Sequence, residues 1–131
     1  MTTRRNFLKT PAITTAGIGL LPAFSSAITG CAPSDRINVG LIGCNGMGFA
    51  DLSEFLKHPN VECLALCDID NNVLQSRAAD VQKIRGAAPA NLYKDWRKVI
   101  DNKDIDLVIV GTPDHWHCLH MISACEAGKD V

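Results

Sequence analysis

From residue 37 onwards, the apolar positions of this chain fall into short runs separated by longer amphipathic stretches. The short runs have the length of strands and lie at Ile37–Ile42, Val61–Cys67, Asn91–Tyr93 and 106–110. The longer stretches have helical spacing and predict helices at 46–58, 71–84, 96–102 and 116–127. The run LeuValIleVal is continuously apolar, as in a parallel strand that is covered on both faces. We therefore predict an α/β fold, a Rossmann-type parallel sheet with helices on both faces.

A glycine-rich turn, GlyCysAsnGlyMetGly, follows the first predicted strand and opens the first predicted helix. Gly43 permits a sharp turn, and Gly46 and Gly48 leave room for a pyrophosphate group. Asn45 stands where the fingerprint G-x-G-x-x-G has its second glycine, and asparagine tolerates a positive φ angle. The predicted helix at 46–58 would direct its free N–H groups and positive dipole end at the pyrophosphate, and Met47 in its first turn is counted among the cofactor-binding residues. The turn therefore predicts a dinucleotide-binding site.

Asp68 directly follows the second predicted strand, about 20 residues after the last glycine of the turn. A carboxylate at this point can accept hydrogen bonds from both hydroxyls of an adenosine ribose, and it would repel the 2′-phosphate of NADP. We therefore predict that the cofactor is NAD and that NADP is disfavoured. The alternative is that Asp68 is a solvated loop acid or the N-cap of the next helix, a role that Asp70 suits better.

The amino terminus has the composition of an export signal. Arg4 and Arg5 are followed by Phe7 and Leu8, and a weakly apolar stretch extends over 11–28. Because glycine and proline interrupt this stretch, it makes a poor membrane span. Residues 1–30 are therefore predicted to be a twin-arginine signal peptide, which the twin-arginine export machinery would recognise.

Cys31 ends the sequence IleThrGlyCys, which resembles the lipobox of bacterial lipoproteins. Cys31 would then be lipidated, residues 31–36 would form a tether, and the lipid would be the only contact with the membrane. The alternative is a non-lipidated signal with an incidental cysteine. Both alternatives predict an exported protein, either periplasmic or anchored to the membrane as a lipoprotein.

Composition and charge change this picture little. Hydrophobic residues make up 47% of the chain and the formal net charge is −1, so no nucleic-acid partner is indicated. Of the six cysteines, Cys63 and Cys67 lie on the same face of one predicted strand, more than about 10 Å apart, which is too far for a disulfide. Free buried thiols suggest folding in the reducing cytoplasm before export, which the twin-arginine route permits.

Several of these features together resemble the Gfo/Idh/MocA oxidoreductases over residues 37–131. They are the export signal, the glycine turn, Asp68, TyrLysAspTrpArg and, most specifically, ThrProAspHisTrpHis. The resemblance implies that Gly43, Asn45, Gly46 and Gly48 hold a pyrophosphate and that Asp68 binds the ribose. It also implies that Thr112, Pro113 and His117 lie beside the cofactor, toward the nicotinamide, and that Trp96 and Arg97 line the same cleft. The implied substrate is a sugar or polyol, and full-length relatives are expected to be homo-oligomers.

In this family the chain continues after Gly-Lys-x-Val into a strand that ends in Glu-Lys-Pro, whose lysine is the usual catalytic acid/base or substrate-orienting group. Lys129 precedes that strand and is not this lysine, so we assign no catalytic residue. We expect residues 37–131 to be a partial NAD(P)-binding Rossmann domain, truncated before its fifth strand is complete and lacking the C-terminal substrate domain. The strand at Leu107–Val110 should then lie at the sheet edge, and residues 1–131 alone should not catalyse and should scarcely fold.

Other functions stay open at this point. His115, His117, Cys118 and His120 have the chemistry of metal ligands, but no second group of ligands accompanies them, so we assign no metal site. We favour the NAD-binding part of a sugar or polyol oxidoreductase. The alternatives are an NAD-dependent glycoside hydrolase of the same fold and a nucleotide-binding module without turnover.

Overall fold

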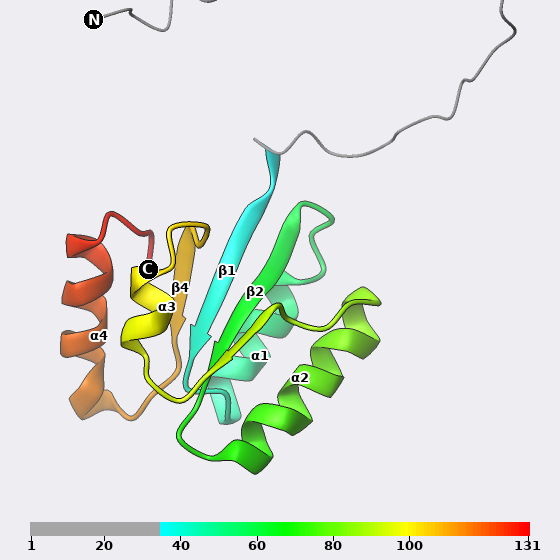
Figure 1. The fold of residues 1–131 in the computed structure, drawn as a ribbon, viewed down its shortest axis with the longest axis horizontal. Coiled ribbons are helices and arrows are strands. Elements are labelled where there is room, and N and C mark those ends of the chain that lie inside the picture. The colour runs from blue at the N-terminus through cyan, green and yellow to red at the C-terminus, as the bar shows by residue number, and fades with distance from the viewer. Residues whose placement is uncertain (1–34) are drawn as a thin grey trace, which may run out of the picture.

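The computed structural model describes residues 35–131, in which strands and helices alternate along the chain (Figure 1). The elements are β1 (Ile37–Ile42), α1 (Gly46–Phe55), β2 (Val61–Cys67), α2 (Asn71–Arg85), β3 (Asn91–Tyr93), α3 (Arg97–Asp101), β4 (Leu107–Val110) and α4 (Asp114–Glu126). Every predicted strand and helix is present, with ends that shift by a few residues. The predicted signal peptide, Cys31 and most of the predicted tether lie outside the described residues.

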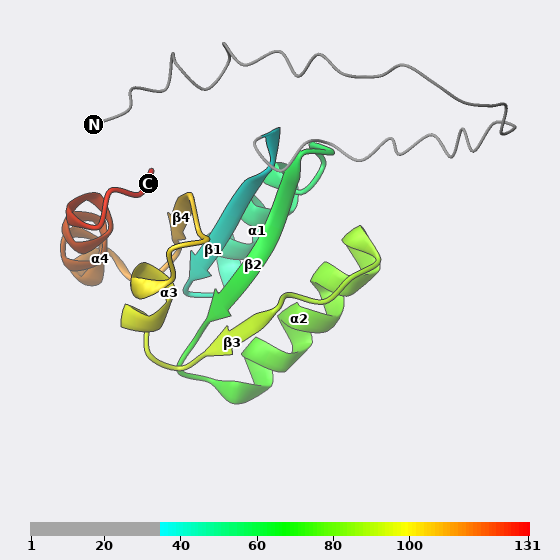
Figure 2. The same cartoon turned by 45° about the horizontal axis from the view of Figure 1, so that its top comes forward.

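The four strands form one parallel sheet in the order β3-β2-β1-β4 (Figure 2). This order confirms the predicted Rossmann-type α/β fold. β4 lies at the sheet edge, as predicted, and beyond it Leu107 forms a single parallel bridge with Asp130. The N–H of Val108 donates to the Asp130 carbonyl at 2.8 Å, and the N–H of Asp130 donates to the Asp106 carbonyl at 3.0 Å. The start of a further strand therefore lies beside β4.

Apolar side chains cover both faces of the sheet. Under α1 and α2 lie Val39, Leu41, Leu52, Leu56, Leu66, Leu74 and Val81, all buried. Under α3 and α4 lie Ile42, Ala65, Val99, Val108 and Ala124, also buried. Successive residues of a strand point to opposite faces, which explains why Leu41 and Ile42 belong to different clusters. Each fully buried Leu, Ile or Val side chain stabilises the fold by about 1.5–3 kcal/mol, so both clusters hold the strand ends in place.

The helix ends follow local sequence signals. Asp70 is the N-cap of α2, and its carboxylate accepts the N–H of Asn72 at 2.8 Å. Asp70 therefore has the N-cap role for which the sequence favoured it over Asp68. α1 ends at Phe55 instead of His58, because His58 precedes Pro59 and is disfavoured in helical geometry. α4 begins at Asp114, two residues before the predicted start, because Pro113 supplies the backbone angle of a helix entrance. None of the helices within residues 35–131 is long and apolar enough to cross a bilayer.

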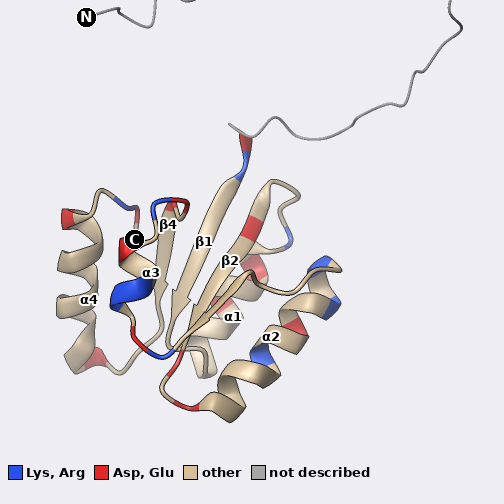
Figure 3. Cartoon of the chain, viewed as in Figure 1, with Lys and Arg blue, Asp and Glu red and all other residues tan. Residues whose placement is uncertain are grey.

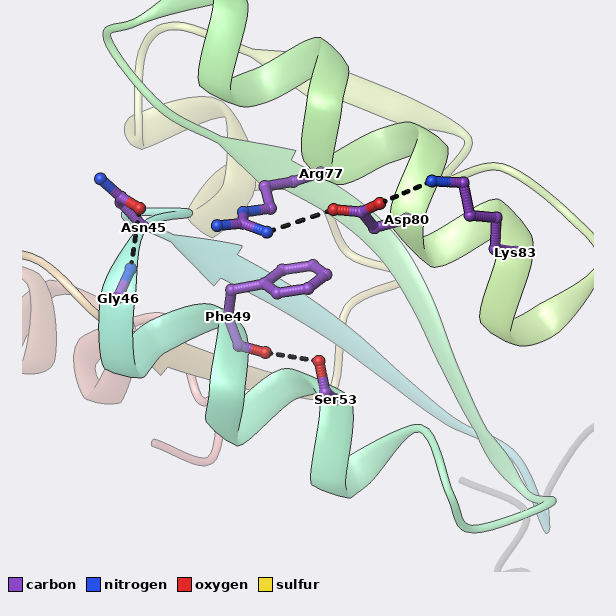
Figure 4. A network of polar contacts seen from close by, with 7 residues as sticks. All are labelled: Asn45, Gly46, Phe49, Ser53, Arg77, Asp80 and Lys83. Carbon is purple, nitrogen blue, oxygen red and sulfur yellow. Dashed lines mark hydrogen bonds and ion pairs between the residues drawn. The ribbon is translucent and has the colours of Figure 1, made fainter.

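Side chains at the boundary between α1 and α2 tie these two helices together (Figure 4). The Arg77 guanidinium lies over the Phe49 ring, 4.4 Å from its centroid, and donates to Asp80 at 3.1 Å. On α1, the Ser53 hydroxyl donates to the Phe49 carbonyl at 2.8 Å. A cation–π contact of this kind contributes about 0.5–1 kcal/mol. It helps to orient α1, whose first turn contains the glycine-rich sequence.

Candidate functional site

A cleft of about 450 Å³ lies at the carboxyl ends of the strands, the end where parallel α/β sheets bind their ligands. Its walls come from the ends of β1, β2 and β4, from the segment between β3 and α3, and from the first turns of α4. A second hollow of about 520 Å³ lies around Ile105 and Lys129, at the opposite ends of the strands. Because that hollow does not include the glycine-rich turn between β1 and α1, we place the candidate site in the first cleft.

Three glycines bring two turns into direct backbone contact at this cleft. A Cβ atom on Gly48 would lie 2.5 Å from the Gly43 carbonyl oxygen and 2.8 Å from the Gly111 Cα. Gly43 has a φ of 87°, a conformation that favours glycine. Gly48 is therefore needed for α1 to pack against the end of β4, a role that the sequence did not predict, while the space it would leave for a pyrophosphate stays a prediction. Gly46, in contrast, faces open space, as predicted.

The turn between β1 and α1 leaves backbone donors unpaired at the N-terminus of α1. Asn45 has a φ of −103°, so the positive φ expected for it is found instead at Gly46, with a φ of 54°. Asn45 is the N-cap, and its Oδ1 accepts the Gly46 N–H at 3.0 Å. Within residues 35–131 the N–H groups of Met47 and Gly48 have no partner, and the Met47 side chain is 73% exposed. These free donors at a helix N-terminus suit an anionic group.

Asp68 joins the glycine turn to the loop after β2. Its Oδ2 accepts the Cys44 N–H at 2.8 Å, and its Oδ1 accepts the Asp70 N–H at 2.9 Å. An ionised carboxylate has about four acceptor sites, so both oxygens can still accept ribose hydroxyls. Asp68 lines the cleft, where its charge is accompanied by that of Lys94. This geometry is compatible with the predicted ribose contact, which stays a prediction.

Only some of the cofactor-binding residues predicted in the turn between β4 and α4 line the cleft. Thr112 and Pro113 line the cleft, whereas His117 does not. The Nε2 atom of His117 lies within hydrogen-bond distance of the Thr112 carbonyl, which can only accept, so this nitrogen carries the proton. His117 therefore stabilises the turn by this hydrogen bond and does not face the cleft. Two residues of α4 line the cleft instead, Trp116 and His120, and for His120 the sequence had suggested only metal binding.

His120 belongs to an aromatic cluster with Trp96 and Trp116. The His120 ring meets the edge of Trp96 with centroids 4.8 Å apart and stacks on Trp116 at 6.0 Å, while its Nδ1 lies 3.3 Å from the Thr112 hydroxyl. Burial lowers the pKa of His120, and the nearby His117 and Arg97 lower it further. The spacing of four between Trp116 and His120 was the sequence signal for a shared helix face. Trp96 comes from a distant loop and lines the cleft, as predicted.

The remaining polar candidates have structural partners or stand apart. Within residues 35–131, no three His, Cys, Asp or Glu side chains converge as a metal site would require. Lys129 is buried, and its Nζ donates to the carbonyls of Asn102 at 2.6 Å and Ile105 at 2.9 Å. Arg97 stacks on Trp96 at 4.7 Å and pairs with Asp95 at 3.2 Å, so it supports the cleft wall from outside.

Known proteins with similar sequences place the chain in a family. Residues 37–131 match the family model GFO_IDH_MocA, described as "Oxidoreductase family, NAD-binding Rossmann fold". A glycosyl hydrolase family 109 protein of Shewanella baltica is 32% identical in an alignment of 146 positions, which covers 96% of this chain and 32% of the relative. An alpha-N-acetylgalactosaminidase of Shewanella oneidensis is 30% identical over the same shares of the two chains. The chain thus spans about a third of the length of these curated relatives.

Solved structures agree with this placement. The myo-inositol dehydrogenase of Lactobacillus casei, in complex with NAD(H) and myo-inositol, superposes with a TM-score of 0.64 at 25% identity. The superposition covers 72% of this chain and 26% of the dehydrogenase. The chain therefore belongs to the Gfo/Idh/MocA oxidoreductase family, and its described part is the NAD-binding Rossmann domain of that family.

Proposed function

We propose that the cleft binds NAD with its pyrophosphate at the N-terminus of α1 and its adenosine ribose at Asp68, and that the full-length protein oxidises or reduces a sugar or polyol. The observation that carries this proposal is the Asp68 carboxylate, which is bonded to the glycine turn at Cys44. That hydrogen bond fixes the distance between the Asp68 carboxylate, which would accept the ribose hydroxyls, and the free N–H groups of α1. A dinucleotide needs both at once, because its ribose and pyrophosphate are directly linked.

The shape and lining of the cleft fit the adenosine half of the cofactor. The adenine ring would extend from the ribose into the part of the cleft lined by Ile69, Trp96 and Trp116. These side chains offer apolar surface and ring faces on which a base can stack. Bound NAD would supply a hydride acceptor at its nicotinamide. The residues of this chain bind and orient the cofactor, and the dehydrogenase similarity supports a sugar or polyol as the substrate class.

Asp68 should make the full-length protein prefer NAD over NADP. Its charge would repel a 2′-phosphate, while its oxygens accept the ribose hydroxyls, a contribution of about 1.5–3 kcal/mol for hydrogen bonds to a charged group. We expect Asp68→Ala to weaken NAD binding by about tenfold or more and to narrow the gap to NADP. Fluorescence titration with both cofactors measures this, with the exposed Asp51→Ala as the matched control. Equal affinities for NAD and NADP in the unmutated protein would refute the assignment.

A glycoside hydrolase that uses NAD is a second candidate, favoured by the two relatives from Shewanella. In such an enzyme the sugar would be oxidised and then reduced again, so hydrolysis would proceed without net formation of NADH. Incubation of the full-length protein with an aryl N-acetylgalactosaminide, followed at the released phenol and at 340 nm, separates the candidates. Phenol release without NADH supports the hydrolase, whereas polyol-dependent NADH formation supports the dehydrogenase. Cofactor binding with neither reaction would indicate the non-catalytic module.

We also propose that residues 1–30 direct export by the twin-arginine route and that Cys31 is then lipidated. The similarity to the Shewanella relatives supports an N-terminal segment shared with them, because 96% of the chain is aligned and only residues 37–131 belong to the family model. Replacing Arg4 and Arg5 together by lysine should leave the protein in the cytoplasm, because a receptor recognises the arginine pair. Cys31→Ser should preserve export but release the protein from membranes. Cys31→Ser protein that still sediments with membranes would exclude lipidation.

A further inference from the structure

The His120 imidazole is a buried polar group that the proposed ribose and pyrophosphate contacts do not use. His120 is only 4% exposed, and its Nδ1 atom lies 3.3 Å from the Thr112 hydroxyl. Within residues 35–131, the Nε2 atom of His120 has no hydrogen-bond partner. Every fully buried side-chain nitrogen or oxygen in this range has a partner, so Nε2 is not fully buried. Nε2 must therefore be reachable from outside. Because His120 lines the cleft, the open side of Nε2 is the cleft itself.

Neighbouring side chains hold the His120 ring in one orientation. Trp116 lies nearly parallel to it, with an interplanar angle of 15°, and Trp96 meets it edge-on at 61°. The Thr112 hydroxyl fixes the opposite nitrogen. α4 itself carries no Lys or Arg, and its charges lie at its two ends (Figure 3). The charged residues that share the cleft with His120 are Asp68 and Lys94. An oriented, uncharged polar atom in an apolar wall is suited to hydrogen-bond one specific ligand group.

The position of Trp96 decides which part of a dinucleotide His120 would meet. Trp96 follows β3, and β3 pairs with β2, whose end carries Asp68. In a Rossmann fold, β1, β2 and β3 form the half that binds the adenosine. His120 itself follows β4, and its Nδ1 faces Thr112. Its ring, however, touches Trp96, and it shares the cleft with Asp68 and Lys94, so its open side faces the adenosine half. The group next to the ribose on that side is the adenine ring.

We propose that His120 hydrogen-bonds the adenine ring of the bound dinucleotide through Nε2 and thereby selects adenine nucleotides. This proposal rests on the proposed NAD-binding function. The hydrogen bond can form with either tautomer of the neutral ring. If Nδ1 accepts the Thr112 hydroxyl, the Nε2–H donates to a ring nitrogen of adenine, and if Nδ1 is the donor, Nε2 accepts from the exocyclic amino group. Trp96 and Trp116, which line the same cleft, would contribute apolar surface to the base.

Substitutions that place a polar atom at one ring nitrogen or the other test this role. In the full-length protein, His120→Phe keeps a ring but removes both nitrogens. His120→Gln places its amide near Nε2, whereas His120→Asn places its amide near Nδ1. We expect His120→Phe and His120→Asn to weaken NAD and ADP-ribose by the same factor, about 3- to 10-fold, the loss of one neutral hydrogen bond. His120→Gln should stay within about twofold of the unmutated protein, as should the control His115→Phe on the exposed face of α4.

Calorimetric titration with NAD and ADP-ribose gives the affinities, and circular dichroism shows whether each variant is folded. ADP-ribose retains the adenine and lacks the nicotinamide, so an equal loss for both ligands locates the contact at the adenosine half. A loss confined to NAD would overturn the proposal, as would unchanged affinity in folded His120→Phe or an equal loss in His120→Gln and His120→Asn. Failure of the unmutated protein to bind NAD would instead refute the proposed function itself.

Discussion

The two walls of the cleft are built in opposite ways. On one side, Gly43, Gly48 and Gly111 allow the backbones of α1, β1 and β4 to approach until a single Cβ atom would clash. On the other side, Trp96, Trp116 and His120 fill the space with large rings from two distant segments. The glycine wall consists of closely packed backbone, and the aromatic wall consists of side chains. The first wall should therefore tolerate almost no substitution, and the second should tolerate rings of similar shape.

The largest effect is expected at Gly48. A Cβ atom there would lie 2.5 Å from the Gly43 oxygen, and backbone atoms cannot move aside as a flexible side chain can. We expect Gly48→Ala to lower the free energy of unfolding by about 3 kcal/mol. Chemical denaturation of the full-length protein measures this loss.

Gly46→Ala is the matched control for Gly48→Ala within the same turn. Gly46 has open space around it and a φ of 54°, so alanine there carries only the cost of left-handed geometry, about 1 kcal/mol. A Gly46→Ala loss as large as that of Gly48→Ala would show that the conformation of the turn, and not the close approach to β4, explains its glycines.

A smaller effect is expected at Trp96 on the aromatic wall. Trp96→Ala removes the edge contact with His120 and the stacking of Arg97, and we expect a loss of about 2 kcal/mol because the ring is only half-buried. Trp96→Phe keeps a ring in place and should lose less than about 1 kcal/mol. The same denaturation experiment compares the two variants. If Trp96→Phe proved as damaging as Trp96→Ala, the proposed tolerance of this wall to similar rings would be wrong.

The fold could be predicted from the sequence because its signals are local. The apolar runs gave β1 and β2 with their observed bounds, and the glycine turn and Asp70 marked the starts of α1 and α2. Errors occurred at helix ends, where Pro59 stops α1 early and Pro113 starts α4 early. These are also local effects, and they moved no residue of the predicted sheet.

The site was less predictable because its contacts join distant segments. The role of Gly48 depends on Gly111 at the end of β4, and the orientation of His120 depends on Trp96 after β3. Neither partner can be identified from spacing along the chain. Asp68 was located from its spacing, but its bond to the Cys44 N–H depends on the fold. Local sequence signals therefore located the cleft, and only the structure showed how its walls are held together.

The aromatic wall should also make stability depend on pH. Burial, with His117 and Arg97 nearby, lowers the pKa of His120 in the folded state, whereas in the unfolded chain histidine titrates at about 6.5. The folded state thus disfavours protonation, so its stability is full above about pH 6.5 and falls as the pH drops through the lowered pKa. The charged residues that share the cleft with His120 are Asp68 and Lys94. His120→Phe should flatten the decrease in melting temperature between about pH 7.5 and pH 5, and the exposed His58→Phe should not.

The smallest effect is expected in the reactivity of the cysteine thiols, which can be measured without changing the stability of the protein. It reports how well the walls of the cleft exclude solvent. Burial raises the pKa of Cys44 and Cys67, beside the glycine turn, to about 12, so almost no thiolate is present at pH 8. Cys118 and Cys125 on α4 are exposed. Iodoacetamide at pH 8, followed by peptide mass spectrometry, should therefore modify the α4 cysteines within minutes and the other two only after denaturant is added. Rapid native modification of Cys67, which lines the cleft, would mean that the wall at the end of β2 opens to solvent. Rapid modification of Cys44 would mean that the glycine turn itself opens, and the contrast between a rigid and a tolerant wall would then fail.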